Sequence, residues 1–272
     1  MILSIALSDF MTLSNGCDVV SIFSVILAAL GGALVGLLIN YLSDVLPATR
    51  QLSRPTCPDC EGAYTLKDYL LIWRCTHCGR QHAARHAVVL VVSVAVSVGL
   101  IFFPVAGLPW PAWLPLLVFL GVIFVVDLEH RLVLFETSLF GLVICFVYGW
   151  VLHGLTITLL GGVGGLGIML GFFLLGAVFS RVVGALRGRK VGEVAFGFGD
   201  VFAGTFLGLL NGWPLIIGTI TLGLLGFAAF SIPYLLLLVL TKRYSAFGNA
   251  LPLTPFLILG AVVMLVLSGG WL

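Results

Sequence analysis

The sequence predicts an all-α protein that crosses a membrane about eight times and carries a small zinc-ribbon-like loop on the cytoplasmic side. Hydrophobic residues make up 61% of the 272 positions and charged residues only 9%, whereas a soluble domain carries about 25% charged side chains. No fold in water could bury that much apolar surface. The lysines and arginines also gather in alternate loops, so the net charge of +2 reflects topology and gives no indication of nucleic-acid binding.

Eight stretches have the length and composition of membrane spans, which need about 20 mostly apolar residues. Only Gly212, Trp213 and Pro214 separate the short sixth stretch from the seventh, so seven spans are the alternative. We expect the first stretch to be retained, because no basic region and no small-residue cleavage site precede it. The expected limits are 19–42, 87–104, 112–127, 136–153, 155–180, 200–212, 214–240 and 250–268.

The distribution of basic residues predicts which loops face the cytoplasm, because positive charge near span ends is retained there. With the N-terminus outside, all 13 lysines and arginines fall between spans one and two or after spans three, five and seven. The outer segments carry only Asp9 and Asp18. Loss of one span would invert the later loops, so this asymmetry favours the even count. The chain then divides into an N-terminal segment with the first span (1–42), a cytoplasmic loop (43–86) and a transmembrane core (87–272).

A dense run of glycines extends from residue 161 to residue 176. The spacings Gly161/Gly165 and Gly167/Gly171 let helix backbones approach closely in lipid. No following Lys or Ser/Thr completes a phosphate-binding loop. We therefore interpret the run as helix packing.

Four of the six cysteines lie in the loop 43–86, in the pairs Cys57/Cys60 and Cys75/Cys78, which 14 residues separate. Two C-x-x-C pairs at this spacing are typical of a four-thiolate zinc site, and Gly79 supplies the turn residue after the second pair. Four sulfurs leave no open position, so the metal would be structural. Two disulfides are the alternative, which a reducing cytoplasm disfavours. A redox-active C-x-x-C would need a βαβ unit that the sequence lacks.

The remaining cysteines and the nearby histidines receive no ligand role. His77, His82 and His86 are expected to be solvated surface residues, because four sulfurs already saturate the ion. Cys17 and Cys145 stand alone. Cys145 lies within an apolar span and is expected to be a small buried hydrophobe.

Two aspartates stand at the ends of apolar spans, where acidic side chains are costly and tend to mark function. Asp127 closes the apolar run 121–126, and Asp200 directly follows Gly197-Phe198-Gly199. By the expected topology both lie at the cytoplasmic boundary and can meet. Two carboxylates that share a site cannot both be ionised, so one can stay protonated while the other accepts a proton from a shared water. This is the working state of an aspartic protease.

The surroundings of Asp200 favour substrate binding. Gly197 and Gly199 lack a Cβ and would let an extended substrate backbone approach closely. The alternative is that each aspartate only marks the membrane interface, paired with Arg131 or with a cation of the segment 181–190. The two aspartates together with the G-x-G-D sequence favour catalysis.

Five motifs follow one another along the chain in a recognisable order. They are Asn40 with Leu46-Pro47, the two C-x-x-C pairs, Asp127-Leu-Glu-His-Arg131, Gly197-Phe-Gly-Asp200 and Leu251-Pro-Leu-Thr-Pro-Phe256. Over about residues 30 to 265 the chain in this way resembles type IV prepilin peptidases. The G-x-G-D sequence and the cytoplasmic cysteine insertion are the most specific parts of the resemblance.

The resemblance implies a polytopic aspartic protease of the bacterial inner membrane whose active site faces the cytoplasm. It carries the catalytic pair over to Asp127 and Asp200. Such enzymes remove the short leader of prepilins and pseudopilins, and many then methylate the new N-terminal amine with S-adenosylmethionine. Grooves between spans would hold the apolar N-terminal helix of the substrate. Glu129, Glu136 and Glu193 would attract its basic leader.

The chain departs from the family pattern at several positions. Phe202 stands where the family often has Lys, and Leu134-Phe135 where it has Pro-Asp. The cysteine loop is shorter than usual and has Lys67-Asp68-Tyr69-Leu70 in place of Asp-Asn-Ile-Pro. Because the family ties methylation to that loop, the departures bear on methylation more than on proteolysis.

Two other functions are compatible with the sequence. An ion- or proton-coupled transporter would use Asp127 and Asp200 to relay charge, and it would favour ionisable groups at the membrane midplane. A catalytically silent assembly factor would account for the missing Lys and Pro-Asp positions.

Overall fold

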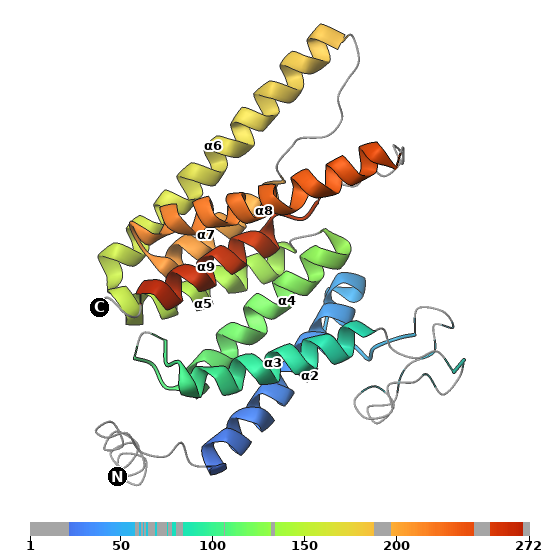
Figure 1. Ribbon diagram of the computed structural model, residues 1–272, viewed down its shortest axis with the longest axis vertical. Helices are drawn as coiled ribbons and strands as arrows, with labels where there is room; N and C mark the ends of the chain where they lie inside the picture. Colours follow the sequence, from blue (N-terminus) through green and yellow to red (C-terminus); the bar gives the residue numbers. More distant parts are fainter. Residues whose placement is uncertain are drawn as a thin grey trace.

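The computed structural model is built from helices (Figure 1). No strand occurs in the described part of the chain, which confirms the all-α prediction there, while most of the loop predicted to resemble a zinc ribbon lies outside the described residues. The structure describes residues 22–57, 60, 62, 64, 69, 75, 78–79, 84–105, 107–131, 134–187, 197–241 and 251–268. The N-terminal segment predicted to lie outside the membrane falls outside these residues.

Eight α-helices coincide one by one with the eight predicted spans, and a 3₁₀ helix, η2 (Trp110–Trp113), precedes the third of them. Six helical segments are long and apolar enough to cross a membrane, so the chain is a multi-pass membrane protein. The helices are α2 (Ile22–Thr49), α3 (Ala84–Phe102), α4 (Leu114–His130), α5 (Phe135–His153), α6 (Leu155–Arg187), α7 (Phe198–Asn211), α8 (Leu215–Leu240) and α9 (Thr254–Ser268).

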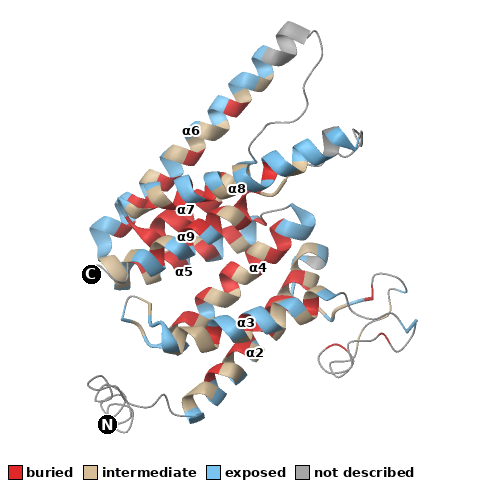
Figure 2. Ribbon diagram, viewed as in Figure 1, coloured by how far each residue is buried: buried red, intermediate tan, exposed pale blue. Residues whose placement is uncertain are grey.

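The prediction of about eight full spans is confirmed only in part, because α7 and α9 have 14 and 15 residues. A helix of that length covers about 21 to 23 Å, whereas the hydrocarbon core of a bilayer is about 30 Å thick. Helix α7 lies inside the bundle, where buried residues concentrate (Figure 2), while α9 buries one face and exposes the other. Phe206 and Leu210 of α7 and Leu257 of α9 are fully buried.

The outer faces of the long helices are apolar and exposed. Leu30 of α2 is 63% exposed, Val163 of α6 68% and Leu175 of α6 67%. Exposed apolar patches of this kind mark contact surfaces in proteins. On helices of this length they are the surfaces expected to face lipid.

Chain direction alternates from one helix to the next. Figure 1 therefore shows the ends of α2, α4, α6 and α8 and the starts of α3, α5, α7 and α9 toward its right-hand side. The cysteine loop follows α2, Asp127 lies at the end of α4, and Asp200 lies at the start of α7. The alternation places all three on the same side of the bundle, as the distribution of charges predicted.

Glycines bring α6 and α7 into backbone contact. A Cβ on Gly161 would lie 2.3 Å from the carbonyl oxygen of Gly208, and a Cβ on Gly165 would lie 2.1 Å from that of Gly204. No side chain fits at such distances. The packing role predicted for Gly161/Gly165 is confirmed. The contact at Gly204 holds α7 against α6 one helical turn after Asp200.

The packing role predicted for Gly167 and Gly171 is wrong. Both are exposed, and a Cβ on either would meet no described atom within 4 Å. Gly167 is two residues from Gly165, which places it on nearly the opposite side of a helix with 3.6 residues per turn. The second glycine pair therefore points away from α7.

The helices next to the cysteine loop extend further than expected. Helix α2 continues to Thr49, and α3 begins at Ala84. This early start places His86 in the helix at 7% exposure, so the expectation of a solvated surface histidine is wrong for His86. The Asn40 side-chain amide donates to the His86 carbonyl oxygen at 3.1 Å and joins the two helices. Cys145 is fully buried, as predicted, while His77, His82 and Cys17 lie outside the described residues.

Candidate active site and metal centre

The four cysteine sulfurs converge on one point, as the two C-x-x-C pairs predict. All four Sγ atoms lie within 4.8 Å of one another. Cys57 Sγ is 3.6 Å from Cys78 Sγ, and Cys60 Sγ is 3.7 Å from Cys75 Sγ. A tetrahedral site with Zn–S bonds of about 2.3 Å separates its sulfurs by about 3.8 Å, so the cluster has the dimensions of a metal site. A disulfide needs about 2.05 Å, so the disulfide alternative is wrong and none of the four cysteines is disulfide-bonded.

The backbone around the cysteines forms the tight turns that such a cluster needs. Gly79 has a φ of 74°, and its N–H donates to the Cys75 carbonyl oxygen at 2.9 Å. This confirms the turn predicted after the second pair. At the first pair the Cys57 N–H donates to the Gly62 carbonyl oxygen at 2.9 Å.

Asp127 lies in the last turn of α4 and is only 6% exposed. Its backbone carbonyl accepts the N–H of Arg131 at 2.9 Å, where α4 ends. Its side-chain Oδ2 has no hydrogen-bond partner in the described part of the chain. A buried acceptor without a partner costs about 1 to 3 kcal/mol. This oxygen is therefore available to a hydrogen-bond donor from outside the chain.

Asp200 is the third residue of α7 and makes a reciprocal contact with Gly197, which directly precedes the helix. The Asp200 N–H donates to the Gly197 carbonyl oxygen at 3.1 Å, and the Gly197 N–H donates to Asp200 Oδ2 at 3.0 Å. A carboxylate that reaches back in this way caps the first turn and interacts favourably with the helix dipole. The Asp200 side chain is thereby fixed by its own helix.

The fold itself does not require glycine at position 197. Gly197 has a φ of −77°, which any residue adopts. A Cβ there would meet only Asp200 Oδ2 at 3.7 Å and the Gly199 N–H at 3.9 Å within the described structure, which are ordinary contacts. The space beside Asp200 is therefore open on this side, as the predicted approach of a substrate backbone requires.

Thr254, the first residue of α9, lies between the two aspartates. Its hydroxyl donates to Asp200 Oδ1 at 3.3 Å. Its hydroxyl and backbone N–H also interact with Asp127, which in turn lies within electrostatic range of Asp200. Thr254 is fully buried. Three helix ends thus bring two carboxylates and one hydroxyl together.

Sequence analysis missed the contact that Thr254 makes. The available signal was a hydroxyl residue between Pro252 and Pro255, at the start of an otherwise apolar helix. The segment 251–256 contributes to the family resemblance, which predicts no role for its side chains.

Glu129 does not join the two aspartates. Its carboxylate forms an ion pair with Arg85 of α3, and Arg85 also pairs with Asp44 of α2. In this structure the Glu129 carboxylate is held by Arg85. Its predicted role in substrate binding stays a prediction. Asp127 forms no ion pair with Arg131 in the described structure, so that part of the interface alternative is wrong. Glu193 lies outside the described residues.

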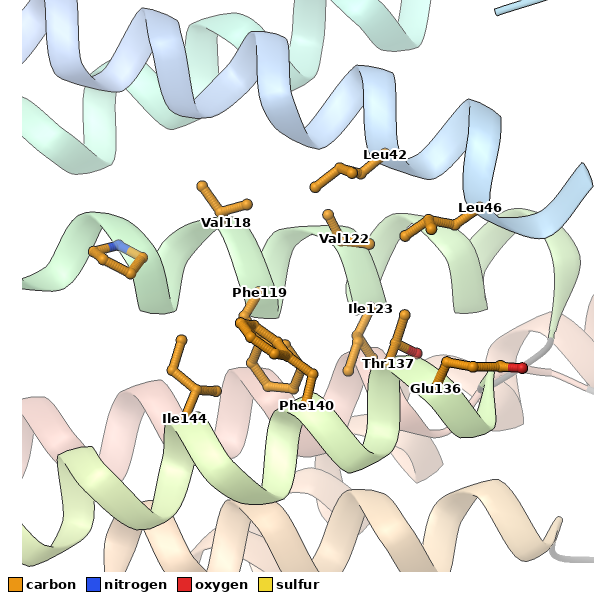
Figure 3. A pocket seen from close by; sticks show the side chains of 11 residues that line it. Leu42, Leu46, Val118, Phe119, Val122, Ile123, Glu136, Thr137, Phe140 and Ile144 are labelled. Atoms are coloured by element: carbon orange, nitrogen blue, oxygen red, sulfur yellow. The ribbon is translucent and has the colours of Figure 1, made fainter. Parts of the chain in front are cut away.

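An apolar groove of about 440 Å³ runs over α4 between α2 and α5 (Figure 3). Phe119 and Ile123 of its floor are four residues apart, and Asp127 is four residues further along the same stripe of α4. Glu136 is the charged residue of the lining and lies at the end toward which α4 runs. The lining residues are Leu42, Leu46, Pro115, Val118, Phe119, Val122, Ile123, Glu136, Thr137, Phe140 and Ile144.

Comparison with protein-family models, with curated proteins and with solved structures found no match to this chain.

Proposed function

We propose that this chain is a membrane aspartic endopeptidase that removes the N-terminal leader of type IV prepilins or pseudopilins at the cytoplasmic face of the bacterial inner membrane. The observation that carries the proposal is the convergence of Asp127 and Asp200 on the Thr254 hydroxyl. The resemblance of the motifs supports the choice of substrate.

The chemistry follows from two carboxyl groups that share one water. The ionised carboxylate takes a proton from the water, whose oxygen attacks the scissile carbonyl carbon. The protonated carboxyl donates a hydrogen bond to the carbonyl oxygen. The C–N bond then breaks as a proton passes to the leaving amine, and no covalent intermediate with the enzyme forms. Thr254 would orient Asp200 through its bond to Oδ1.

The groove over α4 suits the apolar segment that follows the scissile bond of such a substrate. A helix laid along Phe119 and Ile123 would end beside Asp127. Glu136 would attract the basic leader by opposite charge. Substrate binding and cleavage would then share the same end of α4.

We propose zinc as the ion of the four-cysteine cluster. Four thiolates saturate a tetrahedral zinc ion and exclude water from it, so the ion would hold the loop together and take no part in cleavage. N-methylation of the new terminus with S-adenosylmethionine remains an expectation from the resemblance alone.

The position of the acids favours a peptidase over a transporter. A coupled transporter would place its ionisable groups near the midplane of the membrane. Asp127 lies in the last turn of α4 and Asp200 in the first turn of α7. Groups at helix ends would lie nearer to a soluble leader sequence than groups at the midplane.

Incubation of the purified protein with a synthetic prepilin-like peptide tests the proposal. The peptide carries a short basic leader, a scissile bond and an apolar segment, and mass spectrometry reads the released leader. We expect one cut at the junction between leader and apolar segment. The Asp200→Asn protein is the control. A peptide left intact by the folded, metal-loaded chain, or cut equally by the control, would refute the proposed function.

A further inference from the structure

A connected row of contacts leads from the four-cysteine cluster to the end of α4. Tyr64 interacts with Cys57, and its ring packs edge-on against that of Tyr69 with centroids 5.8 Å apart. The Tyr69 hydroxyl donates to Asp44 Oδ2 at the end of α2. The buried phenol of Tyr69 therefore connects the loop that holds the cysteines to α2.

Arg85 continues this row into α4. Its Nη2 donates to Asp44 Oδ1, and its Nη1 donates to Glu129 Oε2. The guanidinium is planar and carries several donors in fixed directions, so one side chain can bridge two carboxylates. The Arg85 side chain is only 18% exposed. Glu129 lies in the same last turn of α4 as Asp127.

The surroundings of Asp44 hold this arrangement in place. His86 Nε2 lies 3.1 Å from Asp44 Oδ2, and the His86 ring packs edge-on against Tyr69 at 5.9 Å. When one member of a partly buried charge network is removed, the others are left without a partner, which is costly. A change at the cysteine cluster should therefore alter the contacts at the end of α4, and a change in α4 should alter those of the cysteine loop.

We propose that Arg85 couples metal binding at the four cysteines to the position of the end of α4, and so to Asp127. Metal binding and folding are linked in small cysteine modules. A loop that has lost its ion no longer holds Tyr69 against Asp44, so the carboxylate that Arg85 joins to Glu129 loses one of the contacts that fix it. Arg85 is in this sense a positioning residue. The consequence for peptide cleavage rests on the proposed function, whereas the link between the metal and α4 does not.

Such coupling is reciprocal, so a change in α4 must alter metal retention. Glu129→Gln removes the charge that pairs with Arg85 and changes no residue of the cysteine loop. We equilibrate the zinc-loaded, full-length protein with increasing concentrations of a chromogenic chelator and obtain the zinc affinity from the competition. The expected result is an affinity about fivefold weaker or more than that of the wild type. Glu136→Gln, which neutralises an exposed acid of α5 outside the row, is the matched control and should bind zinc with the wild-type affinity.

Hydrogen exchange reads the same coupling in the opposite direction. Zinc removal should speed exchange of the amides at the end of α4, residues 126–131, in the wild type and much less in Glu129→Gln, where the link is already broken. Arg85→Lys keeps the charge but cannot bridge two carboxylates in the same way, so it should lie between the two. This variant also serves if Glu129→Gln fails to fold.

Equal zinc affinities of Glu129→Gln and the wild type would overturn the coupling. An equal loss of affinity in Glu129→Gln and Glu136→Gln would overturn it as well, because the effect would then be one of overall charge. Coupling in a protein that cleaves no prepilin-like peptide would leave the inference standing and refute the proposed function.

Discussion

The four-cysteine cluster and the pair of aspartates are built in different ways. The cysteines come from one loop, in which Cys57 and Cys78 are 21 positions apart, and turns within that loop bring their sulfurs together. Asp127, Asp200 and Thr254 come from three helices, and Thr254 is 54 positions from Asp200. The first site is local, and the second depends on how the helices pack.

The two sites should therefore respond to different kinds of substitution. The cluster depends on its own ligands and turns and, through Arg85, on one link to α4, so damage to the bundle away from that link should leave its metal in place. The acids depend on contacts far from their own side chains, such as the close approach of α6 and α7 at Gly161 and Gly165. Changes to the acids should therefore lower cleavage without lowering metal content.

The largest effect is expected at the acid pair. Asp127→Asn and Asp200→Asn each remove a proton-accepting carboxylate at nearly constant volume. We expect each to lower the initial rate of leader release by at least about 10³-fold, with zinc content unchanged by elemental analysis. Cleavage by the wild type should follow a bell-shaped pH profile, because one acid must be protonated and the other ionised.

The double variant tests whether the two acids act as one unit. Residues that act as one unit are strongly non-additive, so Asp127→Asn with Asp200→Asn should be no slower than either single variant. Substantial cleavage by one of the single variants would contradict the pair. If only Asp127→Asn stays active, another acid takes its role.

The second effect concerns the metal. The purified chain should hold about one zinc, and Cys75→Ser should hold none, because the loss of one thiolate opens a closed tetrahedral site. Metal binding in such modules is worth on the order of 10 kcal/mol. Hydrogen exchange should then rise in residues 50–79 while α7 stays protected. Simultaneous loss of protection in α7 would show that the cluster is not local.

The third effect separates substrate approach from folding. Gly197→Ala introduces a Cβ that the described structure accommodates without a clash, so thermal unfolding and zinc content should match the wild type. If a substrate backbone passes beside Asp200, the methyl group displaces it, and an error of about 1 Å can cost about 10²-fold in rate. We expect cleavage to fall by about 10- to 100-fold. Wild-type kcat/KM in this variant would remove Gly197 from the substrate site.

Much of the fold could be predicted because it depends on properties that run along the chain. Apolar length located all eight helices, and ligand spacing located the metal site. The faces of the helices could not be predicted in this way. A helix that is apolar all round has no polar face to mark its buried side, so the sequence does not distinguish the packed Gly165 from the exposed Gly167.

The same reason explains what was missed at the candidate site. Asp127 and Asp200 stood out as rare acids in apolar segments. Thr254 and Arg85 did not, because their importance depends on which helix ends meet. His86 was misplaced because α3 begins at Ala84, before the apolar run that marked the span.

The smallest expected effect concerns Thr254, which tests whether the acid pair depends on a contact between helix ends. Thr254→Val keeps the shape of a fully buried side chain and removes the hydroxyl that donates to Asp200 Oδ1. A hydrogen bond to a charged group is worth about 1.5 to 3 kcal/mol. If about half of this orients Asp200 in the reaction, kcat should fall about 3- to 10-fold. KM and zinc content should stay unchanged, because the substrate groove and the cysteine loop do not include this residue.

Thr254→Ser is the control, because it keeps the hydroxyl and should keep most of the rate. A loss in Thr254→Ser as large as that in Thr254→Val would assign the effect to packing of the methyl group. A loss of zinc in either variant would contradict this comparison, because Thr254 is not among the residues that link the cysteine loop to α4 through Arg85.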